Sequence, residues 1–272
     1  LVLENGKELN LFIRCQDKSG NSNEAEYAVR LCVDPSPDTT PPKIEATSII
    51  ENACVAEGVS SSEVEFYTNE PAECKWSHFD QDYDQMPNGM SCANEFYQFN
   101  AAQLFTCRAT LEGITRDGTE YYIRCKDGKG KEEADRNPMR ESFKFSLRGS
   151  TGLRMTSLKP DETIFGGVSP LPVELYVETL FGCNNGRAIC EYSDSGIDGN
   201  YIQFFDTNTD DGIHTQRQDL ADGDYEYFIR CIDAGGNIAV NSTEFTVEVD
   251  ETPPSIARIY HENSFLKIIT IN

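Results

Sequence analysis

The sequence YYIRCKD at residues 121–127 recurs twice in closely related form, and this repeat decides the fold. It reads LFIRCQD at residues 11–17 and YFIRCID at residues 227–233. Apolar and polar residues alternate in each copy, as in a β-strand with one buried face. The cysteines of successive copies are 110 and 106 residues apart, about the length of one β-sandwich domain. The sequence therefore predicts tandem sandwich domains.

The residues around each copy extend the pattern. A glycine-containing turn follows each copy, and a second alternating strand is predicted at residues 29–33, 143–147 and 245–249. Proline-bearing linkers follow at Thr40-Pro41-Pro42 and Thr252-Pro253-Pro254. Earlier in the two full copies, strands are predicted at residues 64–68 and 173–177, and cysteine-bearing strands at residues 72–76 and 188–192. No segment has a convincing helical period, so the prediction is an all-β chain.

The repeat resembles the fibronectin type III and immunoglobulin-like superfamily of sandwiches. The run Gly118 to Arg124 is similar to that family's sixth strand, which begins with a tyrosine; Leu11 replaces this tyrosine in the first copy. More narrowly, the cysteine-bearing motifs resemble repeats in large predicted surface proteins of archaea. The resemblance implies tandem immunoglobulin/fibronectin III-like β-sandwiches with intradomain disulfides.

Alignment of the repeat copies divides the chain into four predicted segments. Residues 1–40 are expected to be the C-terminal half of a sandwich domain, and residues 41–150 and 151–251 complete domains. Residues 252–272 are expected to be the N-terminal strands of a further domain, or donor strands for a neighbouring chain. A half sandwich cannot bury its apolar face, so either the polypeptide continues beyond both ends or strands of one chain complete another.

Composition and charge narrow the function classes. The chain carries 23 Lys and Arg against 46 Asp and Glu, for a net charge of −23. Such an acidic surface repels phosphate backbones, so no nucleic-acid partner is expected. We found no transmembrane run in this segment and no catalytic constellation. The Asp194-Ser195-Gly196 triplet, for example, has no histidine at a predictable position. The sequence therefore indicates a protein that is not an enzyme.

Ten cysteines predict an oxidising, extracellular or cell-surface location. No C-x-x-C motif is present and the three histidines are scattered, which argues against zinc. From the resemblance, Cys74 and Cys125 occupy neighbouring strands and are expected to pair, as are Cys190 and Cys231. Two further expected disulfides join Cys92 to Cys107 and Cys32 to Cys54. The partners of Cys15 and Cys183 stay open.

The Cys32–Cys54 pair is predicted for a specific reason. Alternation places Cys32 on the outward face of its strand, beside a linker, and Cys54 follows that linker. A bridge between them would lock two domains into a rigid rod.

No cofactor is expected, with calcium as an alternative. The segment from Asp206 to Gly212 superficially resembles a calcium loop, but its glycine is one residue late and Arg217 stands where a glutamate is required. Looser calcium sites could come from Asp80, Asp82 and Asp84, or from Asp34 and Asp38. A glycosylation sequon, Asn241-Ser242-Thr243, is expected in a loop before a strand.

These observations predict a structural component of an extracellular assembly such as a surface layer, stalk or filament. Its expected partners are neighbouring copies of the chain, through strand complementation, or adjacent domains of a longer chain. The alternative is a cell-surface adhesin that binds a partner protein or glycan. An exposed apolar or aromatic patch on one domain that the others lack would favour the adhesin.

Overall fold

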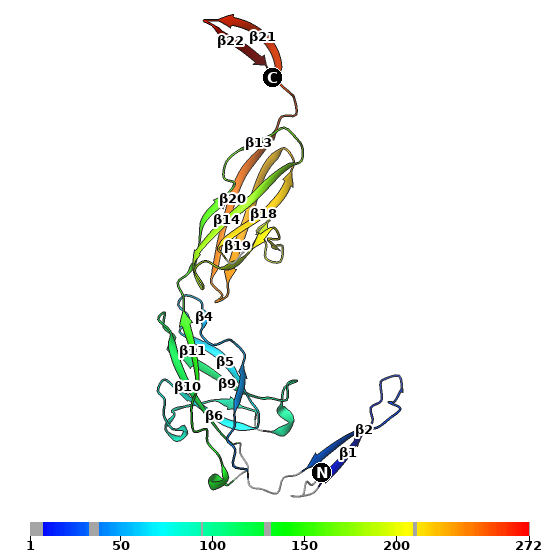
Figure 1. Cartoon of the computed structure of the whole chain (residues 1–272), viewed down its shortest axis with the longest axis vertical. Helices are drawn as coiled ribbons and strands as arrows, with labels where there is room; N and C mark the ends of the chain where they lie inside the picture. Colours follow the sequence, from blue (N-terminus) through cyan, green and yellow to red (C-terminus); the bar gives the residue numbers. More distant parts are fainter. Residues whose placement is uncertain (1–7, 33–37, 94, 128–131, 209–210, 272) are drawn as a thin grey trace.

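The computed structural model describes residues 8–32, 38–93, 95–127, 132–208 and 211–271, apart from the side chain of Phe96. The described residues form two complete β-sandwich domains, with a separate two-stranded hairpin on either side of them in the sequence (Figure 1). Each sheet lies within one of the four predicted segments. The only helices in the described ranges are single 3-10 turns, and none has the length and hydrophobicity of a membrane span. The chain is all-β, with tandem immunoglobulin/fibronectin III-like sandwiches.

The middle domain contains nine strands and three 3-10 turns among its described residues. One sheet has the order β3-β5-β9-β8 and the other β4-β11-β10-β6-β7. The strands are β3 (Ile44–Thr47), β4 (Ala53–Val55), β5 (Ser61–Thr68), β6 (Ala72–Ser77), β7 (Asn88–Gly89), β8 (Ser91–Cys92), β9 (Phe105–Glu112), β10 (Thr119–Asp127) and β11 (Phe143–Gly149), and the 3-10 turns are η1 (Tyr83–Gln85), η2 (Phe96–Gln98) and η3 (Glu133–Asp135).

The third domain repeats this arrangement. Its sheets have the orders β12-β14-β18-β17 and β13-β20-β19-β15-β16, which match the middle domain strand for strand. Its strands are β12 (Leu153–Lys159), β13 (Ile164–Gly166), β14 (Leu171–Phe181), β15 (Ala188–Ser193), β16 (Ile202–Gln203), β17 (Thr207–Asn208), β18 (Ile213–Leu220), β19 (Gly223–Asp233) and β20 (Ile238–Val249).

The inward-facing residues of the predicted strands form the two cores. In the middle domain, the Phe66 ring of β5 packs edge-on against Phe145 of β11, with ring centroids 5.4 Å apart. Trp76 and Tyr121 pack in the same way at 5.6 Å. In the third domain, Tyr227 and Phe245 stack at 6.1 Å. Each domain thus buries one aromatic-rich core between its two sheets.

A tyrosine fixes one corner of the middle domain. Tyr121 is fully buried, and its hydroxyl donates a hydrogen bond to the Glu112 carbonyl at 2.9 Å. Burial raises the pKa of Tyr121 to about 12. In the third domain this kind of bond comes from Tyr225, whose hydroxyl donates to the Ala221 carbonyl.

Two hairpins flank the domains in the sequence. The first joins β1 (Glu8–Ile13) to β2 (Tyr27–Cys32) and corresponds to β10 and β11; Val33, at the end of the predicted strand, lies outside the described residues. The second joins β21 (Ser255–Glu262) to β22 (Phe265–Ile271) and corresponds to β3 and β5. β21 even has the one-residue bulge of β3 and β12. Apolar side chains of both hairpins are exposed.

Candidate functional site

Three of the expected cysteine pairs are brought together as disulfides within single domains. They are Cys74–Cys125 and Cys190–Cys231, with Cα atoms 4.0 Å apart, and Cys92–Cys107 at 3.9 Å. In each pair the two cysteines are direct register partners on adjacent antiparallel strands. These disulfides therefore brace single sheets and do not cross the sandwich.

The expected Cys32–Cys54 pair is wrong, because Cys54 bonds to Cys183. Cys54 lies on β4, which runs parallel to the last residues of β11, where Cys54 is paired with Arg148. Although it follows the first linker in sequence, Cys54 is therefore at the opposite end of the domain, next to the third domain. Cys32 is an exposed free thiol, as is Cys15. The Cys54–Cys183 bond joins the middle domain to the third.

The turn from Asp233 to Asn237 forms the third domain's side of this junction. Asp233 Oδ1 accepts hydrogen bonds from the Gly235 and Asn237 amides, both at 2.9 Å. Its Oδ2 accepts from Asn237 Nδ2 at 2.8 Å and from the Cys183 amide at 2.7 Å. One buried carboxylate therefore fixes the turn and the backbone of the bridging cysteine together.

The Asn237 side chain extends the network into the middle domain. Its Oδ1 accepts a hydrogen bond from the Glu57 amide at 2.8 Å, and its Nδ2 donates to Ser150 Oγ at 2.7 Å. Ser150 Oγ in turn donates to the Val55 carbonyl at 2.8 Å. Asn237 and Ser150 are both buried, so water does not compete for these bonds. The junction is thus a polar network beside a covalent bond.

Gly235 allows the two domains to approach this closely. A Cβ atom at this position would lie 2.3 Å from Cys183 Sγ and 3.1 Å from the Val55 carbonyl carbon. Any larger residue would therefore push the turn away from β4.

The same turn occurs in the first hairpin. Asp17 Oδ1 accepts from the Ser19 and Asn21 amides at 2.9 Å, and Asn21 Nδ2 donates to Asp17 Oδ2 at 2.9 Å. Both turns read D-x-x-G-N, and Gly20 and Gly236 have φ values of 91° and 87°. The sequence reasoning missed this motif, although two copies of D-x-x-G-N are readable in it.

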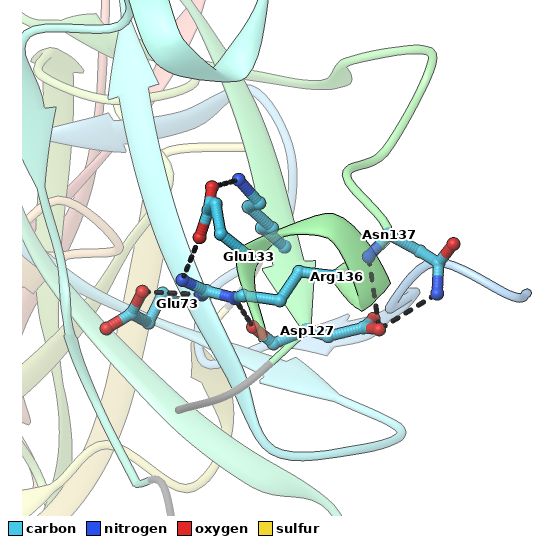
Figure 2. Close-up of polar contacts among 6 residues, drawn as sticks. Glu73, Asp127, Glu133, Arg136 and Asn137 are labelled. Carbon is cyan, nitrogen blue, oxygen red and sulfur yellow. Dashed lines mark hydrogen bonds and ion pairs between the residues drawn. The ribbon is translucent and has the colours of Figure 1, made fainter. Parts of the chain in front are cut away.

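The middle domain has a longer version, shown in Figure 2. Asn137 donates to Asp127 Oδ2 through its amide at 3.1 Å and through Nδ2 at 3.0 Å, and its Nδ2 also donates to the Asp38 carbonyl of the preceding linker. The corresponding asparagine therefore reaches a neighbouring segment in both complete domains. An insertion that includes η3 separates Asp127 from Asn137 and hides the motif in the sequence.

The described residues of this insertion, from 132 onward, lie over the outer face of the β4-β11-β10-β6-β7 sheet. Arg136 Nη2 bonds to Glu73 Oε2 at 2.5 Å, and Lys126 forms an ion pair with Glu133 (Figure 2). The hydrogen bond from Lys126 lowers the pKa of Glu133. Tyr83 covers the same face, since Lys75 lies 4.6 Å from its ring centroid. The outward-facing register partners Glu73 and Lys126 are thus charged, and other side chains cover them.

The third domain has an apolar row at the equivalent positions. Ile189, Ile232 and Ile238 are successive register partners on β15, β19 and β20, where the middle domain has Glu73, Lys126 and Pro138. Ile189 is 54% exposed and Ile238 is 59% exposed. Ile189 and Ile232 line a surface groove of about 540 Å³, which Ala188 and Gln203 also line. This patch was not predicted from the sequence.

The aspartates of one candidate calcium site pair with an arginine. Arg124 donates to Asp82 Oδ1 at 2.9 Å and to Asp80 Oδ1 at 3.2 Å, and Ser142 also donates to Asp80. These bonds use one oxygen, Oδ1, of each carboxylate.

Most of the remaining aspartates of the expected calcium sites are either outside the described residues or already have an interaction partner. Asp34 and Asp210 are outside the described residues. Asp206 Oδ2 accepts a hydrogen bond from the Arg217 amide. Carboxylate oxygens of Asp38, Glu70 and Asp127 lie within 4.8 Å of one another, and each of these residues already has an interaction partner.

Two further predicted sites can be placed. Asn241 is exposed, but it lies inside β20 and not in a loop, because β20 begins at Ile238. Ser195 Oγ is bonded to Ser193 and Asn200, so the Asp194-Ser195-Gly196 triplet is a hydrogen-bonded turn.

His214 lies on β18 of the third domain. It is fully buried, with its ring nitrogens 3.0 Å from Thr179 Oγ1 and 2.7 Å from Asn208 Oδ1. Burial lowers the pKa of His214 to about 4. Its surroundings are those of a structural core residue.

No model of a known protein family matches the sequence, and no curated protein matches it. Solved structures with similar architecture include three consecutive immunoglobulin domains of titin, with 14% identity over 80% of this chain and 68% of that one and a TM-score of 0.38. The fibronectin(III)-like modules of Clostridium thermocellum CbhA match at 10% identity over 76% of this chain and 94% of theirs, with a TM-score of 0.40. Sidekick-1 immunoglobulin domains 1–4 match at 11% identity over 87% of this chain and 57% of theirs, with a TM-score of 0.35. These TM-scores are low, so the fold assignment rests on the strand order of the chain itself.

Proposed function

We propose that this chain is a structural part of an extracellular assembly such as a surface layer, stalk or filament. The observation that carries the proposal is the junction between the two complete domains. Tandem domains joined only by a linker move relative to each other by default. Here Cys54–Cys183, the Asn237 network and the close contact at Gly235 oppose that motion. A fixed junction transmits force and sets a defined spacing, as a structural element requires.

The four disulfides support a location outside the reducing cytosol. The acidic surface supports a role that needs solubility and no contact with nucleic acid. The proposed role is non-catalytic, and the buried histidine of the third domain, His214, lies between Thr179 and Asn208 in the core.

Assembly would occur through neighbouring copies or adjacent domains. In strand complementation, the β21–β22 hairpin of one copy would cover the β1–β2 hairpin of another, as β5 covers β10 and β11 through Phe66 and Phe145. Such a unit would lack counterparts of β4 and of β6, β7, β8 and β9. It would also lack the counterpart of Cys74, so Cys15 would stay a thiol. Adjacent domains that supply those strands would complete the sandwich more fully.

Electron microscopy of native material, labelled with an antibody against this chain, tests the structural role. The proposal predicts label at regular spacing on a layer, stalk or filament. Label confined to dispersed single particles that bind a soluble ligand tightly would contradict it.

A second candidate function is adhesion, and the isoleucine row favours it. The outward row at equivalent positions is charged and covered in the middle domain, whereas in the third domain it is aliphatic, with Ile189 and Ile238 exposed and Ile232 half-buried. An apolar patch on one domain that its sister lacks is typical of an interaction surface. To test this function, candidate partner cells would be added to the chain immobilised on a surface, either unaltered or carrying Ile189→Ser. Adhesion that the substitution abolishes would support this function, and equal adhesion to both proteins would contradict it.

A further inference from the structure

The groove on the third domain combines an apolar floor with an open strand edge. The floor is formed by Ile189 and Ile232, which face outward on adjacent strands. The wall adds the amides of Asn184 and Gln203 and the charged side chains of Arg187, Glu191 and Asp233, of which two are acidic and one is basic. Polar groups around an apolar floor are typical of a binding groove.

The edge of β15 offers backbone hydrogen bonds beside this floor. Cys190 and Cys231 are opposite each other with Cα atoms only 4.0 Å apart, which identifies a non-hydrogen-bonded antiparallel pair. Ala188 is two residues earlier and faces Asp233 in the same way, so its N–H and C=O point away from β19. On that side, β16 pairs with Glu191 and Tyr192 and stops before Ala188.

The middle domain shows what covers the equivalent surface. There the chain's own segment of residues 132–139 lies over the row, with Arg136 and Glu133 matched to Glu73 and Lys126. A charged row is thus covered by a charged polypeptide segment. By the same complementarity, we expect the aliphatic row of the third domain to be covered by a segment with aliphatic side chains.

The net charge of the third domain indicates the charge of the segment that would bind there. Residues 151–251 contain 19 Asp and Glu against five Lys and Arg. An acidic domain attracts a basic partner and raises its rate of association. We propose that this groove binds an extended, basic segment of a partner protein, which adds beside β15 at Ala188 and places alternating aliphatic side chains over Ile189 and Ile232. This inference rests on the adhesive candidate function.

Peptide titration of the full chain tests the proposal. The probe is the acetylated, amidated heptapeptide Lys-Ile-Thr-Ile-Lys-Ile-Thr, and the control peptide replaces each isoleucine with threonine at the same charge. We expect saturable binding of the probe, at least tenfold weaker binding of the control, and a similar loss with the Ile189→Ser/Ile232→Ser protein.

The matched protein control is Phe165→Ser, which removes a 73% exposed apolar side chain at the opposite edge of the same sheet. It should bind the probe like the unaltered chain. Unchanged thermal unfolding of all three proteins will show that the substitutions leave the fold intact.

Equal binding of both peptides, or undiminished binding by the double variant, would overturn the proposal. So would self-association in sedimentation that the double variant abolishes, because the face would then belong to a second copy of the chain. Preferential binding of a glycan to the same groove would also overturn it. Failure here leaves the structural role intact, since that role rests on the Cys54–Cys183 junction.

Discussion

Cys54 and Cys183 are 129 residues apart in the sequence, but their Cα atoms lie 5.9 Å apart and their sulfurs are bonded. This bond joins two domains that each have their own disulfide-braced sheet. Beside it, Asn237 and Ser150 form a buried polar network across the same boundary. The junction is therefore part of the folded structure, and the two domains are expected to move as one body.

Removing the interdomain disulfide should loosen the junction. In Cys54→Ala/Cys183→Ala, the interdomain hydrogen bonds and the packing at Gly235 remain, and each hydrogen bond contributes about 1 kcal/mol. Trypsin should then cut after Arg148 or Arg154, beside the boundary, about tenfold faster than in the unaltered chain. The control Cys92→Ala/Cys107→Ala removes a disulfide inside the middle domain and should leave these sites protected. Equal cleavage in both double variants would contradict the fixed junction.

Gly235→Ala should destabilise the third domain by about 1–3 kcal/mol, because the added methyl group would overlap Cys183 Sγ and the backbone of β4. Gly167→Ala is the matched control, since the nearest atom to its Cβ would be the Asp250 carbonyl oxygen at 3.8 Å. That variant should be neutral or slightly more stable. Denaturant unfolding measures both, and similar losses would show that Gly235 is not specially constrained.

Acid should weaken the third domain through His214. The pKa of His214 falls from 6.5 to about 4 on folding, so the unfolded chain binds the proton more tightly. The contribution is fully present above pH 6.5 and is lost as the pH falls toward 4, amounting to about 3 kcal/mol. His214→Gln should flatten this part of the stability profile, and the exposed His261→Gln should not. Parallel profiles for His214→Gln and the unaltered chain would refute this assignment.

Tyr121→Phe should lower the stability of the middle domain by about 1–2 kcal/mol, because it leaves the buried corner without its hydrogen bond to the Glu112 carbonyl. Tyr122→Phe removes an exposed hydroxyl bonded to Glu120 and should change stability by less than about 0.5 kcal/mol. Thermal unfolding of the two variants separates them. Equal effects would mean that the corner bond contributes nothing.

The sequence predicted those parts of the fold that local pattern controls. Alternation and repeat spacing located the strands with Cys74, Cys125, Cys190 and Cys231, because each has one face in a core. The position of Cys54 could not be predicted in this way. The connection from β3 to β4 runs to the far end of the domain, and nothing in the local pattern shows this.

The isoleucine row shows a second limit. Ile189 and Ile232 belong to strands whose inward residues are also apolar, so alternation alone does not show which of them remain exposed. Their significance emerges only when the register is known and the row is compared with Glu73 and Lys126. By contrast, the D-x-x-G-N turn was readable in the sequence at residues 17–21 and 233–237.

Disulfide mapping of the native protein tests the central claim most directly. The protein would be alkylated and digested at acidic pH without reductant, to prevent thiol exchange, and its linked peptides identified by mass spectrometry. The structure predicts a linked pair of peptides that contain Cys54 and Cys183. Cys54 linked to Cys32, or Cys54 and Cys183 both recovered as alkylated thiols, would contradict the fixed junction and the structural role built on it.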